Sequence, residues 1–243
     1  MSALAVFLTA VGLADICRKL TTHRWLPLAT GPLVVLVAAL LAGLWRLGDI
    51  VLLTIAAVAS VAWVRLGSAA ERTGTREGRA LTVFGATAAV LIALAGWTSP
   101  VAGVIARWLR WIDLGDIEPT RALLIFAVVL LQLVTANQLV RLILGAVGAV
   151  RPAGQPQPSD RLKGGRLLGP MERLLIVGLG VGGQIGAASA VVAAKGIIRF
   201  PELNAQRKDA NEGAGIDEVT EYFLVGSFAS WLIAMAGLVL ALH

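Results

Sequence analysis

The sequence contains few charged residues and almost none of the residues that ligate metals. Only 15% of its 243 residues are charged, whereas roughly 25% are charged in a typical soluble domain. A water-soluble fold is therefore not expected. One cysteine, Cys17, and two histidines, His23 and His243, are present. An internal disulfide is thus excluded, and a transition-metal centre is unexpected because such centres draw mainly on Cys and His.

Motifs of several reaction classes are also missing. The chain has no CxxC pair, no HExxH zinc motif, no P-loop and no nucleophile elbow. No cofactor is therefore expected. The net charge of +6 does not indicate a nucleic acid partner, since no basic cluster is interleaved with aromatic residues. Attraction to membrane lipids explains the excess of Lys and Arg better.

Long apolar runs dominate the chain. Hydrophobic residues make up 57% of it, and the mean hydropathy is +0.80. A helix needs about 20 mostly apolar residues to cross the roughly 30 Å hydrocarbon core of a bilayer. Runs near this length occupy residues 2–18, 27–44, 49–65, 80–98, 121–144, 173–195 and 219–241. The predicted fold class is an all-α integral membrane protein, a bundle of about seven transmembrane helices.

The segments between these runs predict the rest of the organisation. Residues 101–112 are too short to span and carry Arg107 and Arg110, so they are predicted to form one interfacial helix. Residues 151–170, rich in Pro, Gly and Gln, are predicted to form a loop between a five-helix region, 1–150, and a two-helix region, 171–243. Both regions are expected to pack as one membrane domain. Six tryptophans near run ends suit an interfacial belt: Trp25, Trp45, Trp63, Trp97, Trp108 and Trp111.

Charge placement predicts the topology. Lys and Arg are more frequent in the odd-numbered connections between runs than in the even-numbered ones. The positive-inside rule then places the N-terminus outside and the C-terminus in the cytoplasm. Residues 3–14 are similar to the apolar part of a signal peptide, but no Lys or Arg precedes them. They are therefore predicted to belong to an uncleaved first helix.

Glycines in the run 173–195 allow two interpretations. Residues 178–183 match the letters of a dinucleotide-binding fingerprint, but the roughly 60 residues after them cannot supply the parallel strands of a Rossmann site. In a helix, small residues at every fourth position instead form a stripe that lets a second helix pack closely. A second copy of the chain or a partner membrane subunit is expected to dock there. The predicted helix-packing residues are Gly178, Gly182, Gly186, Ala190 and Ala194.

Polar residues within the last three runs form candidate ridges. Arg173, Gln184 and Lys195 are eleven residues apart, which places them on one helix face, opposite the small-residue stripe. Such groups either bond neighbouring helices or line a polar path, because unpartnered polar groups are costly in lipid. Glu221 is predicted to pair with Lys195 or Arg199. The candidate cavity residues are Gln132, Asn137, Gln138, Arg141, Glu172, Arg173, Gln184, Lys195, Arg199, Glu202, Glu221 and Tyr222.

Other acidic residues have plainer interpretations. Asp15 precedes Arg18 and Lys19 by three and four residues, and we interpret it as local charge compensation. Asp113 and Asp116 have a spacing that can hold Mg²⁺ on a diphosphate. No second acidic cluster accompanies them, so an exposed acidic loop is favoured.

Several pieces of the second half carry a resemblance to a known family. They are residues 136–141 (ANQLVR), 171–176 (MERLLI), Gln184, 193–200 (AAKGIIRF) with Glu202, and 221–226 (EYFLVG). In this order they resemble a family of uncharacterised bacterial polytopic membrane proteins, domain of unknown function 3307. The resemblance covers residues 136–230 and implies a bacterial cytoplasmic-membrane protein without implying a reaction. That family carries a His before and a Gln after an acidic residue in its first helix, where only Asp15 can correspond here.

Together these patterns predict a protein that transports or senses a small polar or anionic solute. Its polar cavity would be formed by the last three runs and open to the non-cytoplasmic side. One alternative is a non-catalytic subunit or assembly factor of a larger membrane complex. Another is a membrane enzyme that modifies lipid headgroups, with Asp113 and Asp116 or Glu221 as catalytic carboxylates. Enzymatic activity is left open, and a non-enzymatic role is favoured.

Overall fold

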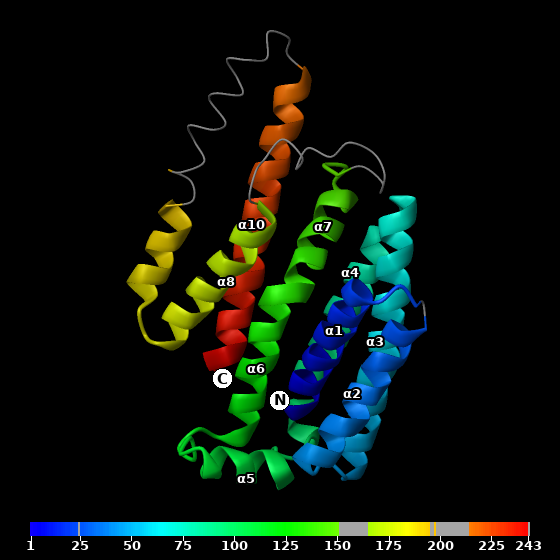
Figure 1. The fold of residues 1–243 in the computed structure, drawn as a ribbon, viewed down its shortest axis with the longest axis vertical. Coiled ribbons are helices and arrows are strands. Elements are labelled where there is room, and N and C mark those ends of the chain that lie inside the picture. Colours follow the sequence, from blue (N-terminus) through cyan, green and yellow to red (C-terminus); the bar gives the residue numbers. More distant parts are fainter. Residues whose placement is uncertain (24, 151–164, 195–196, 198–213, 243) are drawn as a thin grey trace.

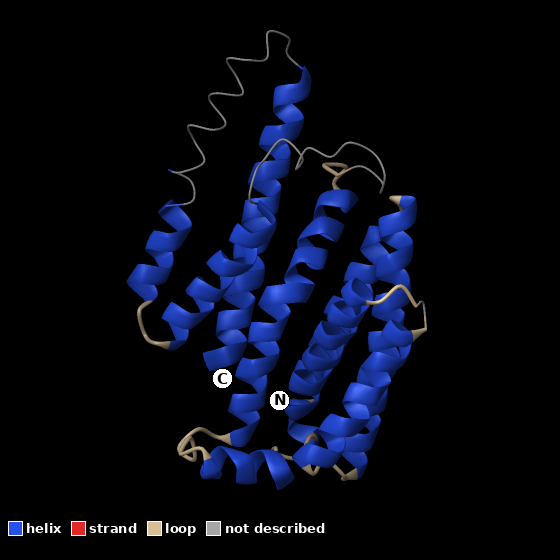
Figure 2. Ribbon diagram, in the orientation of Figure 1, coloured by secondary structure: helices blue, strands red, loops and turns tan. Residues whose placement is uncertain are grey.

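The computed structural model describes residues 1–23, 25–150, 165–194, 197 and 214–242. Side chains are described for all of these except residues 165–167 and 214–219. Over this part of the chain the secondary structure is entirely helical, with no strand (Figure 2). The prediction of an all-α protein is confirmed.

The helices run mostly side by side, and one short helix runs across an end of the bundle (Figure 1). That short helix is α5 (Gly103–Trp111), which carries exposed Trp108 and Trp111. Its interfacial placement stays a prediction. The other elements are α1 (Ser2–Leu20), α2 (Leu26–Ala42), α3 (Leu47–Thr73), α4 (Glu77–Ala93), η1 (Ala95–Trp97), α6 (Pro119–Leu130), η2 (Leu131–Thr135), α7 (Ala136–Ala146), α8 (Gly165–Val181), a helix over Ile185–Ala194, and α10 (Ala214–Leu242).

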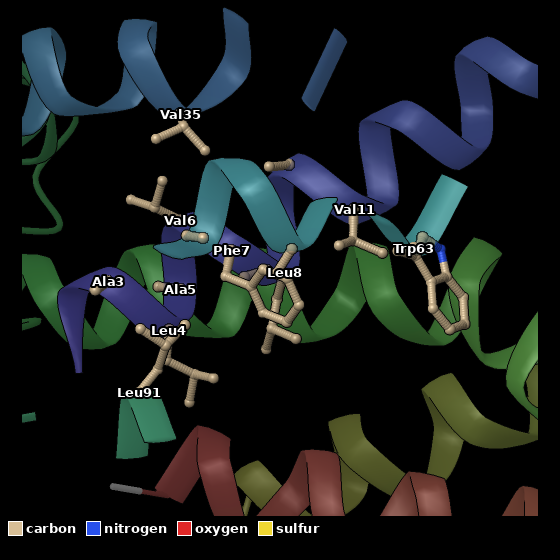
Figure 3. Close-up of a cluster of buried hydrophobic side chains, with 14 of the residues drawn as sticks. Ala3, Leu4, Ala5, Val6, Phe7, Leu8, Val11, Val35, Trp63 and Leu91 are labelled. Carbon is tan, nitrogen blue, oxygen red and sulfur yellow. The ribbon is translucent and has the colours of Figure 1, made fainter. Parts of the chain in front are cut away.

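Helix α1 is the centre of the bundle. It packs against α2, α3 and α6, and its first thirteen residues are buried on almost every side. A helix that is apolar all round is stable only where neighbours cover every face. Phe7 lies beside Phe84 of α4, with ring centroids 5.6 Å apart, and Val35 of α2 joins the same core (Figure 3). Gly12 lets α6 approach, because a Cβ there would lie 2.6 Å from Leu130 Cγ.

The outer surface of the bundle is apolar. Among the described residues, three helices are long and apolar enough to cross a membrane: Leu47–Thr73, Pro119–Ala146 and Thr220–Leu242. Large apolar side chains also project outward along α10, at spacings that repeat on one helix face. A surface of this kind in water would be a large aggregation-prone patch, so the fold indicates a membrane location. The outward α10 residues are Leu224, Phe228, Leu232, Met235 and Val239.

The helix over residues 119–146 contains one turn of π-helix. In this turn, η2, the Ala136 N–H bonds to the Leu131 carbonyl, five residues earlier. The wider turn breaks the regular α-helical hydrogen-bond register of the backbone, and such turns are frequent at functional sites. The two helical halves on either side, α6 and α7, therefore present their side chains on different faces.

The predicted continuous helix over residues 173–195 is wrong. Helix α8 ends at Val181, and Gly183 takes a left-handed φ of 76°. The Gln184 N–H bonds to the Leu179 carbonyl at 2.8 Å, and the Gly183 N–H bonds to the Gly180 carbonyl at 3.1 Å. These two bonds form a Schellman motif, which closes a helix at a glycine. The next helix folds back, since Ala188 packs in one apolar cluster with Ile176 of α8 and Ala234 of α10.

The small-residue stripe is divided by this turn. Gly178 lies on α8, whereas Gly186, Ala190 and Ala194 lie on the helix that folds back. A Cβ at Gly178 or Gly186 would meet no atom within 4 Å among the described residues. A partner along the stripe therefore stays a prediction. Gly180, which the sequence did not single out, is the close-packed glycine of α8, because its Cβ would lie 2.5 Å from the Leu238 side chain of α10.

These two glycines provide a matched test of helix packing. Gly180→Ala is expected to lower the free energy of unfolding by about 1–3 kcal/mol, because the added methyl overpacks the contact with α10. Gly178→Ala, two residues away, meets open space and is expected not to lower it. Reversible unfolding in mixed micelles measures both. Equal effects of the two substitutions would contradict the packing of α8 on α10.

Both described ends of the chain lie at one end of the bundle. Met1 borders the same cavity as Arg121, and the Arg121 Nε donates to the Ala241 carbonyl at 3.3 Å. The first and last helices therefore begin and finish on the same side. We call this side the Met1 end.

Candidate functional site

The carboxylate of Asp15 is buried between three elements. Asp15 is 1% exposed. The Trp63 Nε1 of α3 donates to both carboxylate oxygens at 3.2 Å, and the Thr135 Oγ1 of η2 donates to Oδ2 at 2.9 Å. The Arg18 Nη2 lies 3.7 Å from Oδ1. A buried charge is stable only when paired and hydrogen-bonded in this way.

Two sequence interpretations change here. Trp63 was placed in the interfacial belt, but it is fully buried and binds Asp15, whereas the other five tryptophans of the belt are exposed. Figure 3 shows its indole beside the apolar core of α1. The pairing of Asp15 with Arg18 was expected, but the long-range donors Trp63 and Thr135 were missed. Trp63 packs at 5.1 Å from Phe84, which fixes the ring.

A line of polar groups continues from Asp15 toward the end opposite Met1. The Arg18 Nη1 contacts the Glu71 Oε2 at 3.1 Å and the Ser68 Oγ at 3.4 Å. The Gln138 Nε2 of α7 lies over Gly67 of α3, where a Cβ would lie 2.6 Å from it. We call Asp15, Arg18, Glu71, Gln138 and Arg141 the polar seam.

The seam leads to a small pocket. On α3, Ala70 and Glu71 follow Gly67 by three and four residues, and on α7 Arg141, Leu142 and Gly145 follow Gln138 by three, four and seven residues. Each set therefore continues one helix face. Gly74 is the left-handed residue that ends α3. All six, with Glu77 of α4 and Val150, line a cavity of about 20 Å³. This volume holds about one water molecule.

A second buried network surrounds Arg173. The Arg173 Nε and Nη2 donate to the Gln132 carbonyl at 3.2 and 3.0 Å, and Nη2 donates to the Asn137 Oδ1 at 2.5 Å. The Nη1 donates to the Ser230 Oγ of α10 at 2.9 Å. Beside it the Trp231 Nε1 donates to the Glu172 Oε1 at 3.0 Å. We call Gln132, Asn137, Arg173 and Ser230 the arginine network.

In the arginine network, Arg173 donates hydrogen bonds to neutral oxygen atoms on η2, α7 and α10. Arg173 is 2% exposed, and its guanidinium needs several acceptors to offset its lost hydration. The Gln132 carbonyl is one of them because it lies in the π turn, where the backbone register is disturbed. The Gln132 amide in turn donates to the Ile233 carbonyl at 3.0 Å. Gly237 leaves room for the Gln132 side chain, because a Cβ at position 237 would overlap the Gln132 Nε2.

The seam and the arginine network meet on the π turn. Thr135 at its end holds Asp15 through a side-chain hydroxyl, and Gln132 near its start holds Arg173 through a backbone carbonyl. A rearrangement of these five residues would therefore displace both networks.

The structure distributes the predicted cavity residues over several places. Gln132, Asn137 and Arg173 join the arginine network, with Glu172 beside it, while Gln138 and Arg141 face α3 and the pocket. Gln184 lies exposed in the turn after α8, so it shares no helix face with Arg173. Glu221 is exposed and Tyr222 is half-buried. Lys195, Arg199 and Glu202 lie outside the described residues.

The described residues contain no group of three potential metal ligands, and the interpretation of Asp113 and Asp116 as an acidic loop rather than a Mg²⁺ site stays a prediction. Glu118 caps α6, accepting the Arg121 N–H at 3.0 Å. Partial burial raises the pKa of Glu118, but hydrogen bonds from Thr120 and Arg121 outweigh it and hold the pKa below its ordinary value. A cavity of about 280 Å³ lies beside it, between the start of α1, residues 98–100 and the start of α6.

Comparison of the chain with protein-family models, with curated proteins and with solved structures found no match. The resemblance carried by residues 136–230 therefore stays a prediction.

Proposed function

We propose that the protein is a multi-pass membrane protein that transports or senses a small polar or anionic solute, which binds in the polar seam. The observation that carries this proposal is the amide of Gln138. Its Nε2 is buried and has no hydrogen-bond partner among the described residues. A donor left unpaired in this way costs about 1–3 kcal/mol, and a solute oxygen atom would offset that cost. Because the adjoining pocket holds about one water molecule, the seam must widen to admit the solute.

The neighbours of Gln138 favour an oxygen-bearing or anionic solute. A Cβ at Gly67 would lie 2.6 Å from the Gln138 Nε2 and 4.0 Å from the Arg18 Nη1, so both donors flank one point on α3. Arg141 lies one helical turn further along α7, at the pocket. Guanidinium groups bind carboxylate and phosphate oxygens strongly. The site therefore differs from the predicted cavity, since α1 and α3 replace the last two helices as its walls.

The fold supports a revised topology with six crossings. These are α1, α2, α3, α4, the helix from α6 to α7, and α10, while α8 and the helix over Ile185–Ala194 enter and return as a hairpin. Described basic residues at the Met1 end are Arg46, Arg107, Arg110 and Arg121, and those at the helix ends opposite are Arg18, Lys19, Arg72, Arg76 and Arg79. The positive-inside rule then places the pocket in the cytoplasm and both Met1 and Ala241 outside. A bacterial cytoplasmic membrane is the proposed location.

A second candidate function is that of a subunit in a larger assembly. The open space beside Gly178 and Gly186 favours it, because small residues in lipid are commonly covered by another helix. The partner would be a second copy of this chain or another membrane subunit.

Thermal unfolding in mild detergent tests the solute site. The probes are sodium phosphate, sodium acetate and glycerol at matched ionic strength. A solute present at 100 times its Kd stabilises the folded state by about 2.7 kcal/mol, so we expect at least one probe to raise the Tm by several degrees. Gln138→Leu is expected to abolish this shift. Gln184→Leu, the same change at an exposed position, is expected to retain it.

Two results would overturn the solute site. One is a wild-type protein that none of the probes stabilises. The other is a Gln138→Leu variant that responds as strongly as Gln184→Leu, because the buried amide would then take no part in binding.

A further inference from the structure

In the polar seam two carboxylates lie around one guanidinium. Asp15 and Glu71 both contact the single guanidinium of Arg18. The elements packed around them carry further charged groups at the same end: Lys19 on α1, Arg65 and Arg72 on α3, Glu77 and Arg79 on α4, and Arg141 on α7. Helix α2 contains no titratable residue, and the only one on α6, Arg121, lies at the Met1 end. If one of the two carboxylates bound a proton, the Arg18 guanidinium would be paired with one negative charge instead of two.

Asp15 is the better acceptor of that proton. Its side chain is 1% exposed, whereas that of Glu71 is 30% exposed and remains hydrated beside the pocket. Burial disfavours the ionised form of a carboxyl group, so the more buried member of a pair that shares one cation takes the proton first.

Protonation of Asp15 would change the hydrogen bond between Asp15 and Thr135. In the present structure the Thr135 hydroxyl donates to the Asp15 Oδ2. When Oδ2 carries a proton, it becomes a donor, and the Thr135 oxygen accepts from it. The Thr135 hydrogen then turns toward a carbonyl of the preceding helical turn, that of Leu131, as threonines in helices do.

The Leu131 carbonyl is the acceptor that defines the π turn, because it binds the Ala136 N–H. The carbonyl oxygen can accept a second hydrogen bond, and a threonine hydroxyl that bonds back to the preceding turn bends a helix. The added bond therefore favours a shift of the turn. The Gln132 carbonyl shifts with it and moves relative to Arg173.

We propose that Asp15 is a proton-binding site of the polar seam and that the π turn transmits its protonation to Arg173. The ligand is the proton, exchanged with water at the pocket beside Glu71. The proposal rests on the proposed function and adds its regulation: solute binding in the seam and the position of the α8 hairpin become dependent on pH.

Infrared difference spectroscopy tests both parts on the full-length protein in phosphatidylethanolamine and phosphatidylglycerol vesicles. The pH is varied over about pH 6 to 9, above the range in which exposed Asp and Glu side chains titrate, so that the band reports only a carboxyl group protonated through burial. The wild type is expected to gain a carboxylic acid C=O band as the pH falls, together with a change in the amide I region. Asp15→Asn is expected to lose both signals, and Glu71→Gln to keep both.

Thr135→Val tests the transmission of Asp15 protonation to the π turn separately from the binding of the proton itself. This variant keeps the carboxyl group but lacks the hydroxyl, so it is expected to keep the carboxylic acid band and to lose the amide I change. An amide I change equal to that of the wild type would overturn the transmission through the π turn. So would a wild-type carboxyl band without any amide I change.

The same carboxylic acid band in Asp15→Asn, or no band in the wild type, would overturn the proton site. If Asp15→Asn does not fold, ¹³C-carboxyl labelling of aspartate in the wild type replaces it. The band is then expected to shift to lower frequency, and an unshifted band assigns it to glutamate and overturns the proposal. The thermal unfolding experiment tests the proposed function separately. If solutes raise the Tm of the other variants but not that of Gln138→Leu, the proposed function holds whichever of these outcomes is found.

Discussion

Asp15→Ala is expected to lower the free energy of unfolding by about 3–5 kcal/mol. The substitution leaves the Trp63 N–H and the Arg18 guanidinium without the buried carboxylate that both contact, and breaking a buried ionic network at one partner has costs of this size. The bundle is sensitive at this point because α1, α3 and η2 all bind the same side chain.

Chemical unfolding in mixed micelles, followed by tryptophan fluorescence, measures this effect. Asp116→Ala is the control, because Asp116 is exposed in the loop before α6 and surface changes are usually within ±0.5 kcal/mol. If Asp15→Ala were as stable as Asp116→Ala, Asp15 could not be the buried centre of the bundle.

Arg173→Met is expected to lower the free energy of unfolding by about 3 kcal/mol. Methionine fills much of the arginine volume but donates no hydrogen bonds, so the Gln132 carbonyl, Asn137 and Ser230 each lose a donor. An unsatisfied buried polar group costs about 1–3 kcal/mol. The substitution also removes the desolvation cost of the buried charge. The expected loss of stability is therefore smaller than the sum of three such penalties.

Arg107→Met provides the control for this change, since Arg107 is exposed on α5. The same unfolding measurement applies. A stabilised Arg173→Met variant would show that the guanidinium is held at a net cost and does not support the packing of α8 and α10 on the π turn.

The helices could be predicted because the features that produce them are local in the sequence. Apolar runs such as 2–18 and 219–241 became α1 and α10 with small changes at their ends, since the length of such a run and its bounding polar residues are visible in the sequence. The break after Val181 was missed. Its signal was present in the Gly182-Gly183 pair, but close packing of small residues and a helix end at glycine both use the same residue type.

The site was predictable only in part. Gln132, Gln138 and Arg173 were found because a polar residue within an apolar run needs a partner somewhere. The identity of that partner is a long-range property: Thr135 reaches Asp15 across 120 residues of sequence. The π turn that unites the two networks leaves no pattern in residues 131–135 that distinguishes it from an ordinary helix.

The coupling free energy between Asp15 and Arg173 tests most directly whether the two buried networks form one unit. It is obtained from the unfolding free energies of wild type, Asp15→Asn, Arg173→Met and the double variant. Substitutions without shared partners add to within about 0.3–0.5 kcal/mol, whereas those in one network deviate by about 0.5–3 kcal/mol. Because both side chains bind the π turn, we expect a coupling of about 1 kcal/mol. Strict additivity would contradict a single unit joined at residues 131–135.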